Sequence, residues 1–572
     1  MRIFLCCLSL LLLHSTVNAQ SADIGLYQQS SEVNNIMVLF NADKGALNRF
    51  YAIRNSPERR ERMKKMTDEY EKRLSQLDFD KLPTGSKVDY ILFQRDMQHD
   101  LYELATEKKE YDQIVKWFPF AERIYDIERA RRRGAAPDAE KLAAEMNSIA
   151  KELTQSKTAL EKEKDMPLAL SRRAAATAQG LQAALKSSFD FYNGYDPLYT
   201  WWIPMPYKRL DGLLDEYANL LTGKGKNDPS QKDDGSGIIG SPIGREEIIR
   251  QLQQEMIPYT PEDLIAIANK EFAWCDAEML KASREMGFGD DWKAAMEKVK
   301  NSYVPPSKQP EAMMKLYDES VDFIKKHQLI TIPELGEETW RMSMMAPERQ
   351  LVSPFFLGGE EFIISYPTNT MQHDDKMMSM RGNNPHFSRA TVHHELFAGH
   401  AMQQFMNRRY KTYRRFNTPF WVEGWALYWE RLLWDLKFPQ SPEDRIGMLF
   451  WRMHRCARII FSLSYHTHKW TPQQCIDFLV DRVNHERANA EGEVRRSFTG
   501  GYGPLYQIAY MIGGLQFEAL KKELVDSGKM SYQQFHDAII RENAMPVEMV
   551  RAILTNQPLK KDFKTSWKFY KL

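Results

Sequence analysis

The chain has 572 residues, of which 43% are hydrophobic and 27% charged, and its formal net charge is +1. This length suffices for two domains or one large helical body, and the composition is ordinary for a globular protein that buries a sizeable core. The near balance of 78 basic and 77 acidic residues gives no sign of a nucleic-acid partner or of an acidic solvating tail.

The first element in the chain is predicted to be a secretory signal at residues 1–19. Arg2 gives a positive start, the run Ile3–Leu13 is apolar apart from Ser9, and Val17–Ala19 has the small-x-small pattern that signal peptidase accepts. An uncleaved N-terminal anchor is the alternative. From the signal we expect an exported protein, periplasmic or extracellular. Because no later apolar run is long enough to span a bilayer, we expect no membrane span after cleavage.

The N-terminal half has the pattern of consecutive helices. Ser56–Leu77 follows a Ser-Pro start and carries apolar residues at helical spacing, and 137–164 and 171–191 are rich in Ala, Leu, Glu and Lys. Residues 20–221 are therefore predicted to form an N-terminal helical region that serves as a scaffold. Residues 222–244 concentrate Gly, Ser, Pro, Asp and Lys, which predicts a linker or a surface loop.

Helical patterns resume at residue 245, and 245–572 is predicted to be a catalytic helical region. The exception is Phe362–Tyr366, a β-prone run that Pro367 ends. It predicts one short hairpin or edge strand before the histidine-rich segment, so the fold class is mainly α. An extended peptide could pair with such a strand, which makes Tyr366 a candidate substrate-binding residue.

The segment from His393 to His400 reads HHELFAGH and is the most informative in the chain. Metallopeptidase helices usually carry His-Glu-x-x-His, because positions four apart share one face and both imidazoles can reach one Zn²⁺. His394 and His400 are six apart, so an ideal helix would place them roughly 120° apart around its axis. Since Gly399 tolerates a bulge or break, we expect a local distortion there that lets the two rings converge.

His393 is the competing first ligand. It lies seven residues before His400, hence about 10 Å away along an ideal helix, and it would leave Glu395 poorly placed. We prefer His394 as the ligand, with Glu395 beside it as the general base that faces the attacking water. Imidazoles that bind no metal are the alternative for the whole segment.

A third ligand is expected from the aromatic stretch Phe420–Glu430, in which Glu423 is embedded. A buried carboxylate is unfavourable unless it is paired or bound to metal. A glutamate on a second helix, about 20–30 residues after the first, completes the His₂Glu set of gluzincin-type sites. A structural carboxylate is the alternative. Glu430, seven residues further on, is on the same helix face and could orient a histidine.

These motifs resemble a bacterial family known as domain of unknown function 885 (DUF885). The family pattern His-Glu-x-x-Pro-Gly-His-His-x-Gln is similar to His394–Gln403, with Ala398 in place of Pro and Ala401 in place of the second His. The second family motif, Glu-Gly-Trp-Ala-Leu-Tyr followed by Glu, matches Glu423–Tyr428 and Glu430 in full.

Two further stretches carry the resemblance. A family pattern of two arginines followed by a histidine is similar to Arg455, Arg458 and His466, and Tyr-x-Ile-Gly is similar to Tyr510–Gly513. The resemblance is good from about Arg245 to the C-terminus. It implies an all-α body around a deep cleft, related in fold to helical zinc carboxypeptidases and oligopeptidases.

We therefore predict an exported, gluzincin-like zinc metallopeptidase that hydrolyses short peptides. Zinc held by two histidines and one glutamate keeps an open position and lowers the pKa of water to about 7. Glu395 would move the proton, and Tyr510 and His466 are candidates for stabilising the oxyanion, each with the alternative of being an ordinary core residue. The predicted zinc ligands are His394, His400 and Glu423.

Arg455 and Arg458 lie three apart on a predicted helix, so one of them, preferably Arg458, could hold a substrate carboxylate. A buried salt bridge is the alternative for this pair. Two other functions stay open: a zinc-dependent hydrolase of a non-peptide amide or ester, and a non-catalytic helical binding protein with a degenerate site, which Ala398 and Ala401 favour. Mn²⁺ and Co²⁺ are alternatives to Zn²⁺, and the sequence leaves the oligomeric state open.

Overall fold

The computed structural model describes residues 31–226, 233–350, 355–439 and 441–572, so the predicted signal at 1–19 lies outside the described residues. The described part is mainly α-helical, as predicted, with two pairs of very short strands. None of its helices is long and apolar enough to cross a membrane. The chain divides into two compact units: unit 1 contains Phe79–Ile91 and Asp233–Leu572, and unit 2 contains Val33–Asp78 and Leu92–Lys232.

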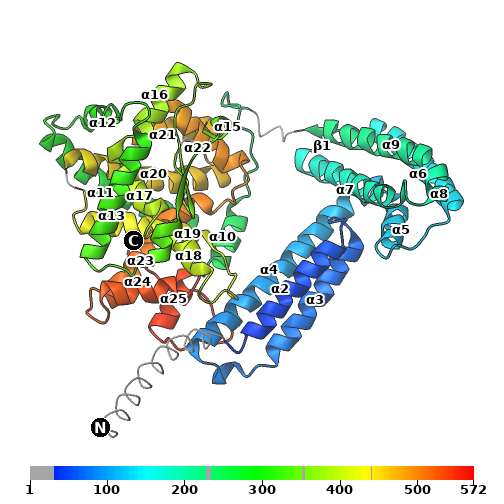
Figure 1. Ribbon diagram of the computed structural model, residues 1–572, viewed down its shortest axis with the longest axis horizontal. Helices are drawn as coiled ribbons and strands as arrows, with labels where there is room; N and C mark the ends of the chain where they lie inside the picture. Colours follow the sequence, from blue (N-terminus) through cyan, green and yellow to red (C-terminus); the bar gives the residue numbers. More distant parts are fainter. Residues whose placement is uncertain (1–30, 227–232, 351–354, 440) are drawn as a thin grey trace, which may run out of the picture. The chain divides into compact units, whose positions relative to one another are not determined.

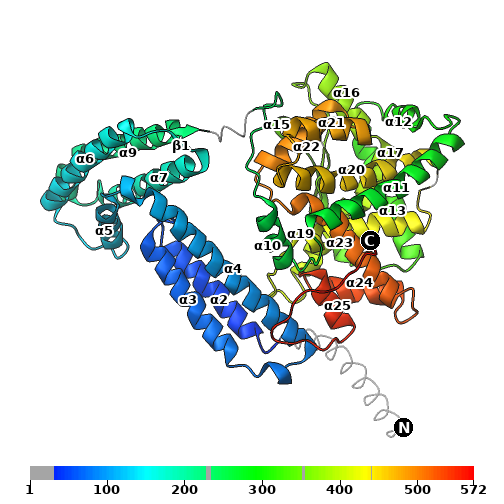
Figure 2. The same cartoon turned by 180° about the vertical axis from the view of Figure 1, so that it is seen from behind.

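Unit 2 is a helical assembly. Its elements are α2 (Asn34–Phe50), α3 (Pro57–Ser75), α4 (Thr84–Ile114, from Leu92 onward), η2 (Val115–Trp117), α5 (Ala121–Arg131), α6 (Ala139–Lys162), β1 (Met166–Pro167), α7 (Leu168–Tyr192), α8 (Pro197–Trp202), α9 (Pro204–Gly223) and β2 (Gly225–Lys226). Helices α6, α7 and α9 pack side by side (Figures 1 and 2). Their inward faces carry Leu153, Leu181 and Tyr217, which are fully buried. This unit is therefore held together by an apolar core.

The helix starts of unit 2 follow local capping chemistry. The Ser56 hydroxyl accepts a hydrogen bond from the Arg59 N–H at the start of α3, where Pro57 is the first helical residue. The Asp138 carboxylate accepts from the Lys141 N–H at the start of α6. Such caps satisfy N–H groups that the first helical turn leaves free. The helices predicted at 56–77, 137–164 and 171–191 are thus confirmed as α3, α6 and α7.

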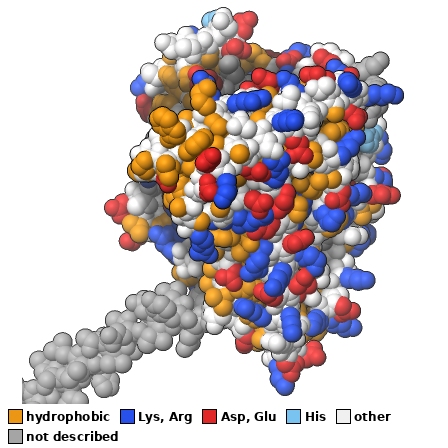
Figure 3. All heavy atoms as spheres, turned by 90° about the vertical axis from the view of Figure 1, so that its right-hand side faces the viewer, with side chains coloured by type: hydrophobic (Ala, Val, Ile, Leu, Met, Phe, Trp, Pro, Cys, Tyr) orange, Lys and Arg blue, Asp and Glu red, His pale blue; other side chains and the backbone are white. Residues whose placement is uncertain are grey.

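Part of the surface of unit 2 is hydrophobic. Tyr195, Trp201 and Met205, on and beside α8, are 85%, 81% and 78% exposed. Figure 3 shows the side of the molecule that is on the right in Figure 1, and hydrophobic side chains gather on part of this face. None of the side chains predicted to act in catalysis or binding belongs to this unit.

Unit 1 carries all the predicted site residues. Its elements are η1 (Phe79–Lys81), the start of α4, α10 (Arg245–Gln254), α11 (Pro261–Glu285), α12 (Trp292–Lys300), α13 (Gln309–Lys326), α14 (Glu334–Thr339), β3 (Arg341–Met344), α15 (Pro347–Gln350), β4 (Glu361–Ile364), α16 (His373–Gly382), α17 (Pro385–Glu395), α18 (His400–Asn407), α19 (Pro419–Asp435), α20 (Pro442–His466), α21 (Pro472–Val483), α22 (Arg487–Thr499), α23 (Tyr506–Leu524), α24 (Tyr532–Ile540) and α25 (Val547–Leu554). The predicted resumption of helix at Arg245 is confirmed by α10, and the described residues 233–244 before it form neither helix nor strand.

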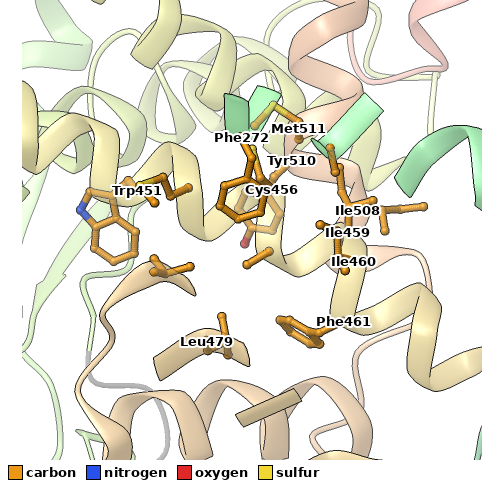
Figure 4. Close-up of a cluster of buried hydrophobic side chains, with 14 of the residues drawn as sticks. Phe272, Trp451, Cys456, Ile459, Ile460, Phe461, Leu479, Ile508, Tyr510 and Met511 are labelled. Carbon is orange, nitrogen blue, oxygen red and sulfur yellow. The ribbon is translucent and has the colours of Figure 1, made fainter. Parts of the chain in front are cut away.

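Helix α20 runs through the middle of unit 1. Every residue from Ile446 to His466 is buried, and α11, α17 and α23 pack around it. Figure 4 shows Cys456 and Ile459 of α20 together with Ile508 and Tyr510 of α23 in one hydrophobic cluster. A helix that is buried on all sides must satisfy or pair every polar side chain it carries, which makes its arginines informative.

Helices α19 and α23 approach each other closely. A Cβ added at Gly424 of α19 would lie 2.5 Å from the Cα of Gly513 in α23, so the two backbones meet with no side chain between them. This contact brings Glu423, the neighbour of Gly424, to the face of α23 that carries Tyr506 and Tyr510. The close packing of two glycines thus positions a carboxylate against two hydroxyl groups.

The predicted strand before the histidine-rich segment is present as β4, which pairs in parallel with β3. Among the described residues, one antiparallel bridge, between Leu357 and Ile363, resembles the predicted hairpin. The segment containing Leu357 continues into Gly358, which lies against the end of α17. The strand therefore places a backbone segment beside the predicted catalytic helix.

Candidate metal centre

The helix carrying the first histidine breaks where the sequence predicts. Helix α17 ends at Glu395 and α18 begins at His400, and the four residues between them are not helical. A Cβ added at Gly399 would lie 1.8 Å from the carbonyl oxygen of His394, so the break leaves no room for a side chain there. The rings of His394 and His400 consequently converge, with centroids 4.9 Å apart.

Glu423 completes a group of three candidate ligands, which we call the metal triad: His394, His400 and Glu423. The Oε2 atom of Glu423 lies 3.5 Å from Nε2 of His394 and 3.3 Å from Nε2 of His400. In a tetrahedral zinc site with bonds of about 2.0–2.1 Å, ligand atoms lie roughly 3.3–3.4 Å apart. Within the described ranges, this is the one group of His, Cys, Asp or Glu side chains with such convergence.

Both imidazoles are held by a hydrogen bond on the side away from Glu423. His394 Nδ1 lies 2.7 Å from Oε1 of Glu430, and His400 Nδ1 lies 3.0 Å from Oε1 of Gln403. When Nδ1 donates to such an acceptor, the Nε2 lone pair is left free to bind a metal. The contact of Glu430 is the one expected from its helix face, whereas the role of Gln403 was not predicted.

The donor set fits a divalent cation. Glu423 is buried; its Oε1 accepts a hydrogen bond from the Tyr506 hydroxyl, and its Oε2 has no hydrogen-bond partner. Burial alone would raise the pKa of Glu423, but His400 and His394 hold it well below its usual range. Burial likewise opposes charge on His400, whose pKa Glu423 nevertheless raises to about 9. The triad therefore favours positive charge at its centre, as a metal site does.

Glu395 ends α17 next to His394 and lines the same cavity as the metal triad. Burial raises the pKa of its carboxyl group above the usual value. A Cβ at Gly358 would lie 2.5 Å from Oε2 of Glu395, so the segment before β4 passes this carboxylate with no side chain between them. A carboxylate with a raised pKa that faces a cavity suits a general base.

Two tyrosines of α23 cover the other side of the triad. The Tyr510 ring stacks on the His394 ring, with centroids 6.1 Å apart, and its hydroxyl lies 3.3 Å from that of Tyr506. Burial and the nearby Glu423 raise the pKa of Tyr510 to about 12, so the hydroxyl stays a donor at neutral pH. Tyr506 was not predicted, although its spacing of one helical turn from Tyr510 could have indicated a shared face.

These side chains open onto one cavity of about 260 Å³. Seven of the nine predicted site residues line it, and their catalytic and binding roles stay predictions. Asn383, Arg496, Tyr502 and Tyr506 line it as well and were not predicted. The deep cleft implied by the family resemblance also stays a prediction. The seven predicted residues in the cavity are His394, Glu395, His400, Glu423, Arg455, Arg458 and Tyr510.

Two predicted residues do not reach this cavity. His466 ends α20, eleven residues or about 16 Å of helix beyond Arg455, and packs beside Phe498. Burial lowers its pKa to about 4. Tyr366 follows β4 and lines a neighbouring cavity of about 300 Å³, where its hydroxyl accepts a hydrogen bond from the Ser307 N–H. Asn383 borders both cavities.

His393, the alternative first ligand, points away from the metal triad. Its ring packs against Phe438, and neither ring nitrogen has a hydrogen-bond partner. Burial lowers its pKa to about 3, so it is a neutral core residue. The structure thus brings His394, and not its neighbour, to the other two candidate ligands.

Comparisons with known proteins identify the fold. The family described as "Bacterial protein of unknown function (DUF885)" matches residues 53–554. A "putative lipoprotein of unknown function" from Shewanella oneidensis has a similar structure, with a TM-score of 0.67 and 16% identity over 92% of this chain and 100% of that one. A second "putative lipoprotein", from Colwellia psychrerythraea, gives 0.54 and 15% over 88% and 91%. Among curated proteins, no relative matches.

Proposed function

Because this chain belongs to the DUF885 family of bacterial proteins, whose description assigns no activity, we propose from the site itself that it is an exported, zinc-dependent peptidase of short peptides. The observation that carries the proposal is the buried Oε2 of Glu423, which lacks a hydrogen bond and faces two imidazole Nε2 atoms. Export is supported by the predicted signal at residues 1–19 and by structural neighbours described as putative lipoproteins.

The metal triad would hold the ion, and the remaining side chains of the cavity would carry out the proton transfers. Zinc, when bound, supplies a Lewis acid that polarises a carbonyl group and lowers the pKa of water. Glu430 and Gln403 fix the two imidazoles in the orientation that directs both Nε2 atoms at Glu423. The geometry is thus set before any substrate arrives, which reduces the reorganisation that catalysis requires.

Glu395 is placed to move the proton. In peptide hydrolysis its carboxylate would accept one proton from the attacking water and donate it to the nitrogen of the leaving amine. The water oxygen forms the new bond to the carbonyl carbon, and the C–N bond breaks. Burial raises the pKa of Glu395, which makes its protonated form accessible for the second transfer.

Tyr510 is the donor best placed to stabilise the negative oxygen that develops on the substrate. It lines the cavity, stacks on His394 and remains protonated at neutral pH because its pKa is raised to about 12. Tyr506 donates to Glu423 and so holds the third ligand. Removing one such donor commonly lowers kcat by about 10²–10³-fold.

The two departures from the family pattern leave the donor set intact. The carbonyl oxygen of Ala398 accepts a hydrogen bond of 2.8 Å from the Trp425 indole N–H, which ties the helix break to α19. Ala401 is buried and does not line the cavity. A non-catalytic binding protein would have no use for a carboxylate at Glu395, so the arrangement favours catalysis.

The test is a Glu395→Gln variant with Glu491→Gln, an exposed position of α22, as the matched control. Metal content after mild purification is measured by mass spectrometry, and cleavage is measured on a library of short peptides. We expect both variants to keep one equivalent of zinc and only Glu395→Gln to lose turnover, by about 10²–10⁴-fold. Undiminished cleavage by Glu395→Gln, or a wild-type protein without bound metal, would show the assignment to be wrong.

A further inference from the structure

Three arginines line the cavity of the metal triad, and we call them the arginine cluster: Arg455 and Arg458 of α20 and Arg496 of α22. Their side chains are 5%, 4% and 12% exposed. Within the part of the chain that the structure describes, the cluster donates one hydrogen bond, from Arg458 Nε to Glu493 at 2.7 Å. Buried nitrogen atoms of all three guanidinium groups have no partner.

The carboxylates near the cluster do not balance it. Glu493 lies 2.7 Å from Arg458 and 3.3 Å from Arg496, so one carboxylate serves two guanidinium groups. Glu430 is 3.6 Å from Arg455, but its closer partner is His394 at 2.7 Å. Buried charges are normally paired and hydrogen-bonded, because an unpaired one is strongly unfavourable. The cluster is therefore short of one anionic partner. Arg455 and Arg496 donate no hydrogen bond to a described residue, and the carboxylate nearest to Arg455, that of Glu430, is already bonded to His394.

The cluster lies close to the metal triad. The guanidinium carbons of Arg455 and Arg458 are 4.8 Å and 4.5 Å from the centroid of the Tyr510 ring. The same ring stacks on His394. The ring of Tyr510 thus lies between the two arginines and His394, the first candidate ligand. One or two residues of extended peptide, each about 3.5 Å long, can span the distance from these guanidinium groups to His394.

We infer that the arginine cluster is a carboxylate-binding subsite that takes the free C-terminal carboxylate of a peptide, so that the enzyme releases residues from the C-terminal end. This inference rests on the proposed peptidase function. A guanidinium group holds a carboxylate through two parallel N–H···O bonds, and the unpartnered nitrogen atoms of the cluster are available for them. An acidic side chain presents the same chemistry, so the test must separate the two sources.

The test compares three versions of one short peptide: a free C-terminal acid, its amide, and an amide with glutamate as the last residue. They are offered to wild-type protein, to Arg455→Met, and to Arg495→Met, which changes the exposed neighbour of Arg496 on the same helix. We expect wild type to cleave the free acid at least about 100-fold more efficiently, by kcat/KM, than either amide. Arg455→Met should lose about 100-fold on the acid and little on the amides, because one partner of a buried ion pair is missing. Arg495→Met should behave as wild type.

A binding measurement separates this inference from the proposed function. Calorimetry with the Glu395→Gln variant, with and without zinc, gives the affinity for the acid and the amide in the absence of cleavage. Tighter binding of the acid that Arg455→Met abolishes supports the subsite, even if no peptide is ever cut. Equal affinity for acid and amide, an equal loss on both in Arg455→Met, or a preference for the amide ending in glutamate would overturn it. Melting temperatures of both variants identify a loss caused by misfolding, and Arg455→Lys, which keeps the charge, should then restore part of the discrimination.

Discussion

The two units of the chain differ in where their charged side chains lie. In unit 2 the charges lie mostly on the outside, as in the Lys186–Asp190 pair, and the helices α6, α7 and α9 bury an apolar core. In unit 1 the metal triad and the arginine cluster are buried except for His400 and Arg496, which are 13% and 12% exposed, and several polar atoms of both groups lack a partner. Burial of a charged or polar group without a partner is unfavourable. We therefore expect such groups at sites where a bound ligand supplies the missing partner. The convergence of these groups in one cavity favours unit 1 as the place of the proposed function, and it agrees with the prediction that unit 2 is a scaffold.

The largest difference between the two units is expected when one glycine is substituted in each of them. Gly399 has no space for a Cβ, which would collide with the His394 carbonyl, whereas Gly180 in the middle of α7 has nothing within 4 Å of that position. We expect Gly399→Ala to displace His394 or His400 and to weaken zinc binding by more than about 100-fold. Gly180→Ala should stabilise its helix by about 0.5–1 kcal/mol.

Zinc affinity from competition with a chelator and the free energy of unfolding from urea titration test both expectations. If Gly399→Ala kept full zinc affinity, the break between α17 and α18 would not be what brings the histidines together. Unchanged or lower stability in Gly180→Ala would contradict the view that unit 2 depends on ordinary helix propensity.

A smaller effect is expected from the carboxylate behind the first ligand. Glu430→Gln should weaken zinc binding by about 10–100-fold, because Glu430 accepts the hydrogen bond that orients His394. Glu271→Gln is the matched control: it removes another buried carboxylate of unit 1, one that pairs with Arg452 away from the triad. That variant should lose stability and keep its zinc affinity. Equal zinc affinities in the two variants would contradict the orienting role of Glu430.

The sequence predicted what depends on local spacing. A Ser-Pro start and helical spacing predicted α3, and a composition rich in Ala, Leu, Glu and Lys predicted α6 and α7. The glycine between two histidines predicted the break that makes them converge. The contact of Glu430 with a histidine followed from its place on the same helix face as Glu423. These features are encoded within one or two helices, where geometry follows from residue number.

Sequence reasoning failed where contacts join distant elements. His466 was grouped with Arg455 because both belong to one motif, yet a straight helix carries it about 16 Å further on. Arg496 was missed because nothing in the sequence shows that α22 packs beside the cavity. The sequence placed Gln403 in the family motif but did not predict its hydrogen bond to His400. That contact depends on how α18 begins after the break.

A further difference expected between the units is a pH dependence confined to unit 1. Burial lowers the pKa of His485 and His536, both in unit 1, to about 3. The only histidine in the sequence of unit 2 is His99, whose side chain is 37% exposed. In the unfolded chain a histidine takes up a proton below about pH 6.5, while these two stay neutral in the folded state down to about pH 3. The free energy of unfolding of unit 1 should therefore fall by about 1.4 kcal/mol per pH unit for each such histidine as the pH drops below 6.5.

Hydrogen exchange at pH 7.5 and pH 5, corrected for the intrinsic rates and performed in chelator so that metal release plays no part, resolves the two units. We expect amides of α20 and α23 to lose protection at pH 5, while those of α6, α7 and α9 keep theirs. His485→Phe, whose ring can pack against Phe450 as the imidazole does, should reduce the acid sensitivity of unit 1. Equal losses of protection in both units would contradict the contrast between them, because unit 2 has no buried histidine to account for its loss.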